Sequence, residues 1–281
     1  MTPRLAQRIF FVLLALCTAI VITPVLIVLG LIVFKGSGAI HWEFLSAMPR
    51  MGMKAGGIFP AIIGTAYLVT VTMLFATPLG VFAAVYLVEY ARDNGLKRFV
   101  EIAIVNLAGV PSIVFGLFGL GLFVMFLKFG VCILSGALTL GIMTLPVIIT
   151  STKEALSSVP RSFREVSLSL GATRWQTIRH SVLPNALPGI LTGTVLGLSR
   201  AAGETAPILF TVAAFYLPRL PHSVFDQVMV LPYHLYVLST QVPNVKPVTQ
   251  YGTALVLVSL VLILNLFAVM IRARFRRQKQ W

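Results

Sequence analysis

Charged residues, and acidic residues above all, are scarce in this chain of 281 residues. Only 11% of the residues are charged, and eight Asp and Glu stand against 22 Lys and Arg. Hydrophobic residues make up 58%, and the mean hydropathy is +0.94. Because an ordinary soluble domain has about 25% charged residues, this composition excludes a water-soluble globular protein and indicates an integral membrane protein.

Other absences exclude several kinds of chemistry. The two cysteines, Cys17 and Cys132, lie far apart in apolar runs, which excludes a disulfide framework or a cysteine-rich metal site. The four histidines are scattered without an HExxH spacing, so we predict no metal-ligating and no catalytic residue. The chain has no G-x-x-x-x-G-K-[ST] motif, and we therefore expect it to hold no nucleotide or other cofactor of its own.

Long apolar runs fill most of the remaining sequence. Six of them are about long enough for a helix to cross a bilayer. They cover approximately residues 9–34, 58–88, 102–127, 131–150, 187–216 and 251–271. The predicted fold is all-α, a polytopic membrane protein with six transmembrane helices. We divide it into an N-terminal helix and external loop at 1–57, a transmembrane domain at 58–271 and a basic cytoplasmic tail at 272–281.

The distribution of positive charge predicts how the chain is oriented. Six spans put both termini on one side of the membrane, and that side has fifteen of the 22 Lys and Arg. The opposite side has six, and Arg200 lies within the membrane. The positive-inside rule therefore predicts that the termini and the loops at 91–98 and 153–184 are cytoplasmic. The tail at 272–281 is explained by contact with anionic membrane lipid, so no nucleic-acid partner is needed.

The segment at 153–184 is the one long polar stretch between two apolar runs. The S/T-x-x-E/Q spacing at Ser162–Glu165 and again at Thr173–Gln176 predicts two short helices, each begun by a capping box. Gly171 between them suits a left-handed helix cap, and we expect Pro184 to limit the second helix. The segment is interpreted as an ordered docking element. The alternative is a solvated loop whose charges only fix the topology.

The run Pro188–Pro207 puts small and charged residues on one face of a predicted helix. At about 100° per residue, three glycines, Arg200 and Glu204 fall within an arc of roughly 80°. The glycines are Gly189, Gly193 and Gly197. Since small residues spaced four apart let a second helix approach closely, we predict a helix-packing face turned toward protein or toward a water-filled pathway.

Arg200 and Glu204 are ionisable groups inside a predicted span. An Arg at the bilayer centre costs about 2.5 to 3.5 kcal/mol on an insertion scale, so its presence requires a reason. One interpretation is an ion pair that only assists helix assembly. The other, which we favour, is a substrate pathway in which the guanidinium offers its planar fork of donors to an anion.

A resemblance to a known family rests on the polar segment. Its pattern resembles the EAA motif of binding-protein-dependent ABC importer permeases. The positions in register are Glu165, Gly171, Leu183 and Pro184, and those that depart from the usual residues are Val166, Ser167 and Ser181. The resemblance implies a type I ABC importer permease fold in which the segment forms coupling helices against an ATPase subunit. The residues that it assigns to this coupling are Arg164, Glu165, Gly171, Ala172, Leu183 and Pro184.

Three further stretches narrow the resemblance. The runs Gly109–Leu120, Glu154–Gly171 and Ser199–Thr211 look like phosphate permeases of the PstA type, and the R-x-x-G-E-T-A-P run is the most specific of them. This resemblance implies phosphate as the substrate and places Arg200 and Glu204 on its path. A permease for another oxyanion or small solute is the alternative. An intramembrane enzyme is less favoured, because Ser199 has no nearby His to activate it.

The same resemblance implies an assembly in the bacterial cytoplasmic (inner) membrane. The expected partners are a second permease subunit resembling PstC, two copies of an ATPase subunit resembling PstB, and an extracytoplasmic phosphate-binding protein. ATP and Mg would be bound by the ATPase partner, so that this chain transports phosphate without being an enzyme.

Overall fold

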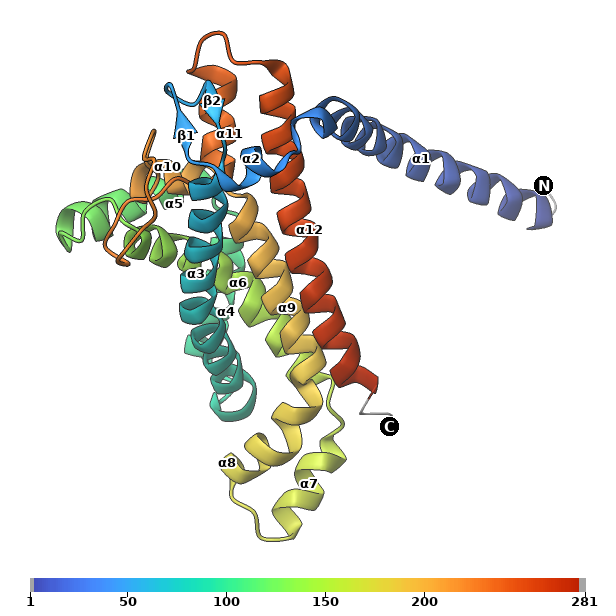
Figure 1. The fold of residues 1–281 in the computed structure, drawn as a ribbon. Helices are drawn as coiled ribbons and strands as arrows, with labels where there is room; N and C mark the ends of the chain where they lie inside the picture. Colours follow the sequence, from blue (N-terminus) through green and yellow to red (C-terminus); the bar gives the residue numbers. More distant parts are fainter. Residues whose placement is uncertain (1–2, 278–281) are drawn as a thin grey trace.

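The computed structural model describes residues 3–277, which form a helical bundle (Figure 1). The helices are α1 (Pro3–Gly36), α2 (Trp42–Ser46), α3 (Phe59–Val85), α4 (Gly95–Ala108), α5 (Ser112–Gly119), α6 (Ile133–Ser157), α7 (Arg161–Ser169), α8 (Arg174–Thr177), α9 (Leu183–Gly203), α10 (Ala206–Thr211), α11 (Leu231–Thr240) and α12 (Pro247–Arg277). At one end of the bundle α7 and α8 form a tip, called the polar tip below (Figure 1). The π-helical turns are η2 (Tyr86–Tyr90), η3 (Leu120–Phe126) and η4 (Ile178–Val182). The predicted all-α class is confirmed.

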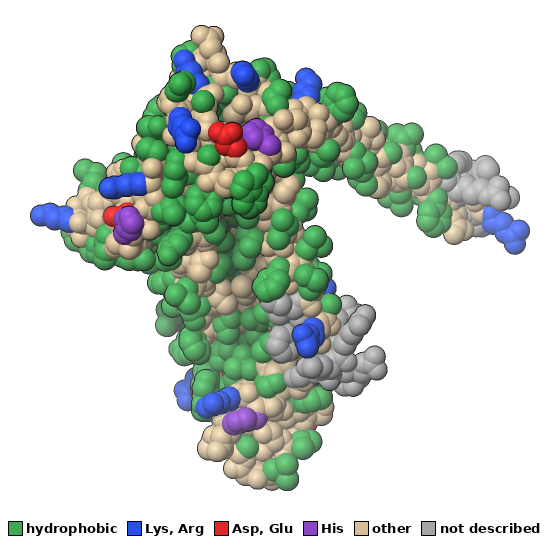
Figure 2. All heavy atoms as spheres, viewed as in Figure 1, with side chains coloured by type: hydrophobic (Ala, Val, Ile, Leu, Met, Phe, Trp, Pro, Cys, Tyr) green, Lys and Arg blue, Asp and Glu red, His purple; other side chains and the backbone are tan. Residues whose placement is uncertain are grey.

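Five helical segments of the described chain are long and apolar enough to cross a membrane, and there are six if one bent pair counts as a span. The five are Phe10–Ala39, Phe59–Tyr90, Ile133–Ser157, Arg174–Gly203 and Pro247–Arg274. On the face shown in Figure 2, Lys and Arg side chains lie toward the ends of the molecule, and hydrophobic side chains cover the region between them. This distribution is the one that a bilayer requires.

The predicted third span, at 102–127, corresponds to a sharply bent pair of helices. The chain breaks after Ala108, and the two halves, Gly95–Ala108 and Ser112–Phe126, meet at 104°. Pro111 causes the break, because proline has no backbone N–H and the residue before it avoids the helical conformation. The second half lies across the bundle, where the glycines of α5 let α10 come close: a Cβ on Gly116 would lie 3.0 Å from the Ala206 carbonyl oxygen.

The predicted fifth span, at 187–216, is displaced toward the N-terminus. Helix α8, the turn η4 and α9 form one continuous segment, Arg174–Gly203, so Pro184 does not end the second short helix. Pro184 lies directly after the π-helical turn η4, where α9 begins, and the helical segment continues through it. At the other end α9 stops at Gly203, and the separate helix α10 follows.

Helices α3, α6 and α9 form the centre of the bundle. Gly80 of α3 lies against Ile148 of α6, where a Cβ would come within 2.7 Å of Ile148 Cγ2. The buried apolar side chains form two clusters. One includes Leu140, Met143 and Leu231 near the end of the bundle with α2 and α11, and the other includes Leu156 and Val182 near the end with α7 and α8. The centre is therefore rigid at both ends of α6.

The outer parts of the chain surround this centre. Helix α1 extends away from the bundle and leaves its most apolar window unburied (Figure 1). The predicted external loop between α1 and α3 contains the 3₁₀ turn η1 (Ser37–Ala39), α2 and a short antiparallel pair, β1 (Pro49–Arg50) with β2 (Ala55–Gly56). The predicted tail at 272–281 is helical as far as Arg277, and its last four residues lie outside the described part.

Candidate functional site

The three glycines of the predicted stripe lie where α9 packs against α6. A Cβ added to Gly189 would lie 2.4 Å from the Ala155 Cβ, and one added to Gly193 would lie 2.5 Å from the Ser151 Cβ. Such distances are far shorter than real carbon contacts, so only glycine permits this approach. Gly197 continues the contact against Ile148. The stripe is therefore turned toward protein along its whole length.

Arg200 lies one turn beyond the last of these glycines. Its side chain is 32% exposed, and its Nε atom is 3.7 Å from the Glu204 Oε1 atom, which makes an ion pair longer than a hydrogen bond. Within the described chain no hydrogen bond to the guanidinium is recorded. Glu204 is therefore the one charged partner of the Arg200 guanidinium in the described part of the chain.

Glu204 is not on the helical face where the sequence pattern predicted it. Helix α9 ends at Gly203, and Glu204 has extended backbone angles, with φ −75° and ψ 138°. Pro207 in the first turn of α10 fixes the start of the next helix and favours an end to α9 at this point. The ion pair between Arg200 and Glu204 survives, but it spans the break between two helices.

Polar contacts to α12 hold the outer side of α9. Ser199 Oγ donates to the Asn265 side-chain oxygen, and Arg272 Nη1 donates to Thr192 Oγ1 at 3.2 Å. Sequence reasoning did not single out Asn265. Its signal was available, since an amide within a long apolar run requires a partner. Arg200 thus lies on a helix that is fixed from two sides.

The polar tip of the bundle contains the two predicted short helices, α7 and α8 (Figure 1). The second capping box is present, with the Thr173 side chain accepting from the Gln176 N–H and the Gln176 side chain accepting from the Thr173 N–H. The first predicted capping box, Ser162–Glu165, is wrong, because α7 begins at Arg161 after Pro160 and has no side-chain cap. Since proline presets the backbone for a helix start, Ser162 falls inside the helix.

Gly171 separates the two helices in the left-handed conformation that was predicted, with φ +83°. Next to it α7 exposes apolar side chains. Val166 is 60% exposed and Leu170 is 83% exposed, and both line a hollow of about 440 Å³ together with His180. Exposed apolar residues gathered at a polar tip are typical of a surface that binds another protein.

The six residues assigned to coupling fall into different environments. Glu165 and Gly171 are exposed, and Ala172 is half-buried beside them. Leu183 and Pro184 are half-buried in the first turn of α9. They continue the tip into a membrane-spanning helix and do not form its outer surface.

Arg164, the sixth residue, points into the molecule. Its side chain is 20% exposed, and Nη2 donates to Glu89 Oε1 at 2.7 Å, while Nε lies 3.1 Å and 3.2 Å from the two carboxylate oxygens. It also donates to the carbonyl oxygens of Leu156 and Val159, each at 2.9 Å. Sequence reasoning missed Glu89, which is 75 residues away along the chain.

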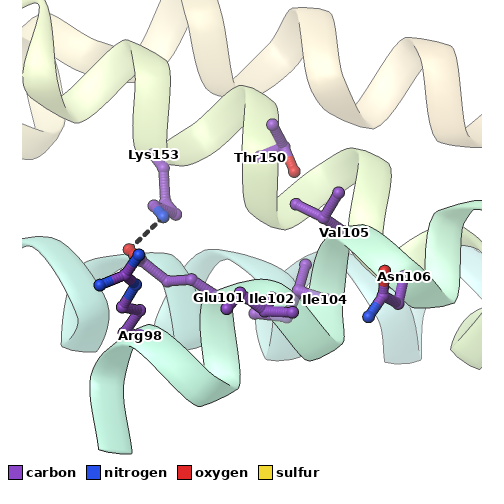
Figure 3. Close-up of a pocket in the computed structure, with 8 residues that line it drawn as sticks. All are labelled: Arg98, Glu101, Ile102, Ile104, Val105, Asn106, Thr150 and Lys153. Atoms are coloured by element: carbon purple, nitrogen blue, oxygen red, sulfur yellow. Dashed lines mark hydrogen bonds and ion pairs between the residues drawn. The ribbon is translucent and has the colours of Figure 1, made fainter. Parts of the chain in front are cut away.

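A second interhelical ion pair lies between α4 and α6. Lys153 donates to Glu101 at the edge of a hollow of about 340 Å³, and Arg98 lies beside the pair (Figure 3). Thr150 and Asn106 line the same hollow. The arrangement attaches the N-terminal half of the broken third span to the centre of the bundle.

Comparison with known proteins gives a consistent result. Residues 76–278 match the model of a family described as "Binding-protein-dependent transport system inner membrane component". The "Probable ABC transporter permease protein YqgI" of Bacillus subtilis (strain 168) is 34% identical over 281 residues, 95% of this chain and 94% of that protein. The "Phosphate transport system permease protein PstA 1" of Mycobacterium tuberculosis (strain ATCC 25618 / H37Rv) is 38% identical over 80% of this chain and 73% of that protein.

Solved structures share the fold at lower identity. A permease of a bacterial ABC transporter involved in the import of the acidic polysaccharide alginate is 17% identical, covers 96% of this chain and 99% of its own, and has a TM-score of 0.66. The MetNI methionine ABC transporter in an inward-facing conformation gives 17% identity, coverage of 76% and 94%, and a TM-score of 0.61. The chain therefore belongs to the family of binding-protein-dependent transport system inner membrane components, which are multi-pass permease subunits of ABC transporters.

Proposed function

We propose that this chain is a permease subunit of an ATP-driven phosphate importer and forms half of the pathway that phosphate takes across the membrane. The observation that carries the proposal is the Arg200 guanidinium, which lies in a membrane-spanning helix with its carboxylate partner 3.7 Å away. Relatives whose names describe phosphate permeases of the PstA type support the choice of substrate.

Arg200 acts by electrostatic attraction and hydrogen bonding and changes no bond in the substrate. A guanidinium presents donors in a planar fork that matches the oxygens of a phosphate. Glu204 holds the side chain in place while the pathway is empty, and its negative charge weakens the binding of phosphate. A transient site must bind strongly enough to admit the ion and weakly enough to release it.

The exposed apolar side chains of α7 are the surface that an ATPase subunit would contact. In this proposal α7 and α8 lie on the cytoplasmic side, as do both termini, in agreement with the positive-inside rule. Two ATPase subunits resembling PstB bind ATP and Mg and perform the hydrolysis. A second permease resembling PstC completes the pathway, and an extracytoplasmic phosphate-binding protein delivers the substrate.

A competition experiment tests the choice of substrate. The whole assembly is reconstituted in lipid vesicles with its binding protein, and ATP-driven uptake of radiolabelled phosphate is measured with unlabelled phosphate, sulfate or molybdate in excess. We expect unlabelled phosphate to suppress the uptake and sulfate and molybdate to leave it unchanged. No ATP-driven uptake of radiolabelled phosphate, or uptake that sulfate or molybdate suppresses as strongly as phosphate does, would contradict phosphate as the specific substrate.

A further inference from the structure

Helix α7 is attached to α3 through one ionic contact. Glu89 lies in η2, which continues α3 beyond Val85, and its carboxylate meets both Nε and Nη2 of Arg164. The Glu89 side chain is 11% exposed, and that of Arg164 is 20% exposed. Because charge-assisted hydrogen bonds in such partly buried sites are short and directional, this contact fixes the orientation of α7 as well as its distance from α3.

The same guanidinium also joins α7 to α6. Its remaining donors reach the carbonyl oxygens of Leu156 in the last turn of α6 and of Val159 just beyond it. The Leu156 oxygen also accepts from the Val159 N–H at 3.3 Å, so the guanidinium adds to the bonds that close the end of α6. Arg164 therefore ties the tip to the ends of two membrane-spanning helices at once.

Phe163 of α7 packs against the buried cluster that includes Leu156 and Val182, but the Glu89–Arg164 contact itself is not enclosed by packing. Hollows of about 440 Å³ and 210 Å³ flank the pair, and both are lined by Glu89 and Arg164. The other described polar contacts of α7 run toward the α9 side, where Ser167 bonds Thr177, and Ser181 donates to the Phe163 carbonyl oxygen. Those contacts would carry a movement of α7 into α9 but not into α3.

We propose that the Glu89–Arg164 pair is the joint that makes α3 follow α7 when the ATPase subunits move the tip, and that Arg164 is a positioning residue and not a contact to the ATPase. This inference rests on the proposed function. Without the joint, the exposed face of α7 still binds the ATPase and hydrolysis continues, but α3 no longer moves in step. ATP is then consumed with little transport.

The first test measures phosphate transported per ATP hydrolysed in vesicles that contain the full assembly. Glu89→Gln keeps an acceptor oxygen but removes the charge, and we expect the ratio to fall about fivefold or more, the lower end of typical coupling energies. Glu89→Asp, which keeps the charge, should recover part of the ratio. The matched control is Glu101→Gln, because Glu101 also joins two helices by an ion pair but does not touch α7.

Two results of this test would overturn the inference. One is an unchanged ratio in Glu89→Gln. The other is loss of the ATPase subunit from the purified Glu89→Gln assembly, which would mean that the pair only maintains the docking surface.

The second test does not depend on the substrate. Spin labels are placed at Ser169 of α7 and at Arg92, just after η2, in a chain whose two cysteines are replaced by serine. When ATP is added to the assembly with an intact Glu89–Arg164 pair, we expect the distance between the two labels to stay constant. In the Glu89→Gln assembly we expect that distance to change. The same response of the label distance in both assemblies would overturn the inference. If the two responses differ but the intact assembly transports no phosphate, only the proposed function is contradicted.

Discussion

Arg164 and Arg200 have the same side chain and opposite surroundings. The donors of Arg164 are occupied by the Glu89 carboxylate and by two carbonyl oxygens at 2.9 Å. Arg200 has a carboxylate at 3.7 Å and is one third exposed. A guanidinium with four of its five donors occupied holds structure together, whereas one with open donors can bind an anion.

His234 gives a pH-dependent prediction. It is 3% exposed in α11, outside the membrane-spanning segments, and burial lowers its pKa from 6.5 to about 4. The unfolded chain takes up this proton near pH 6.5, so stability that is present above that pH is lost as the pH falls toward 4. The loss amounts to about 3 kcal/mol.

Thermal unfolding of the purified chain between pH 7 and pH 4 measures this effect. His234→Gln should be less stable at pH 7 but should lose less of its stability on acidification. His180→Gln, at an exposed position, should behave like the unmodified chain. An unmodified chain whose stability stays constant over this range would contradict the prediction.

Gly193→Val tests the contact between α6 and α9. The added Cβ would lie 2.5 Å from the Ser151 Cβ, so the two helices must separate, and we expect a loss of about 1 to 3 kcal/mol in the free energy of unfolding. Gly95→Ala is the control, because a Cβ there meets nothing within 4 Å. Equal stability of the two variants would show that the close approach is not required.

At the scale of the elements, contacts that attach one helix to the next lie at helix ends. Helix α3 ends in η2, which carries Glu89, and α9 ends between Arg200 and Glu204. Helix α7 ends at Ser169, and Gly171, two residues further on, has a φ of +83°. Since the groups at a helix end lack partners within the helix, these are the places where one element is attached to the next.

Gly171→Val tests the turn between α7 and α8. A Cβ at Gly171 meets nothing within 4 Å, so the effect of the substitution comes from the backbone, which a β-branched residue cannot hold at this φ. We expect the ATPase subunit no longer to co-purify with the variant. Gly171→Asn is the matched control, because Asn tolerates the left-handed conformation. A full complement of ATPase subunit with the valine variant would remove the turn from docking.

Patterns local to one helix were predictable, and contacts between distant segments were not. The glycine stripe follows from a spacing of four residues, and the Thr173–Gln176 box from a spacing of three. The Glu89–Arg164 pair joins positions 75 residues apart, which no periodicity reports. Pro111 was a signal for the break, but apolar residues continue on both sides of it, and composition does not give the angle between the two halves.

At the scale of the whole molecule, the chain is one subunit of a larger transporter. Helix α1 leaves its most apolar window unburied, and α7 exposes Val166 and Leu170 at the opposite region of the bundle. Lipid and partner subunits must cover these surfaces, because water does not tolerate so much contiguous apolar area. In the proposed function, the exposed third of the Arg200 side chain faces the pathway that this chain forms with its partner permease.

The most direct measurement is ATP-driven uptake of radiolabelled phosphate into vesicles that contain the assembly with Arg200→Gln, compared with Arg92→Gln at an exposed position outside the spans. We predict that Arg200→Gln abolishes uptake while the ATPase subunit still co-purifies, and that Arg92→Gln transports at the unmodified rate. Uptake at the unmodified rate by Arg200→Gln would contradict the account.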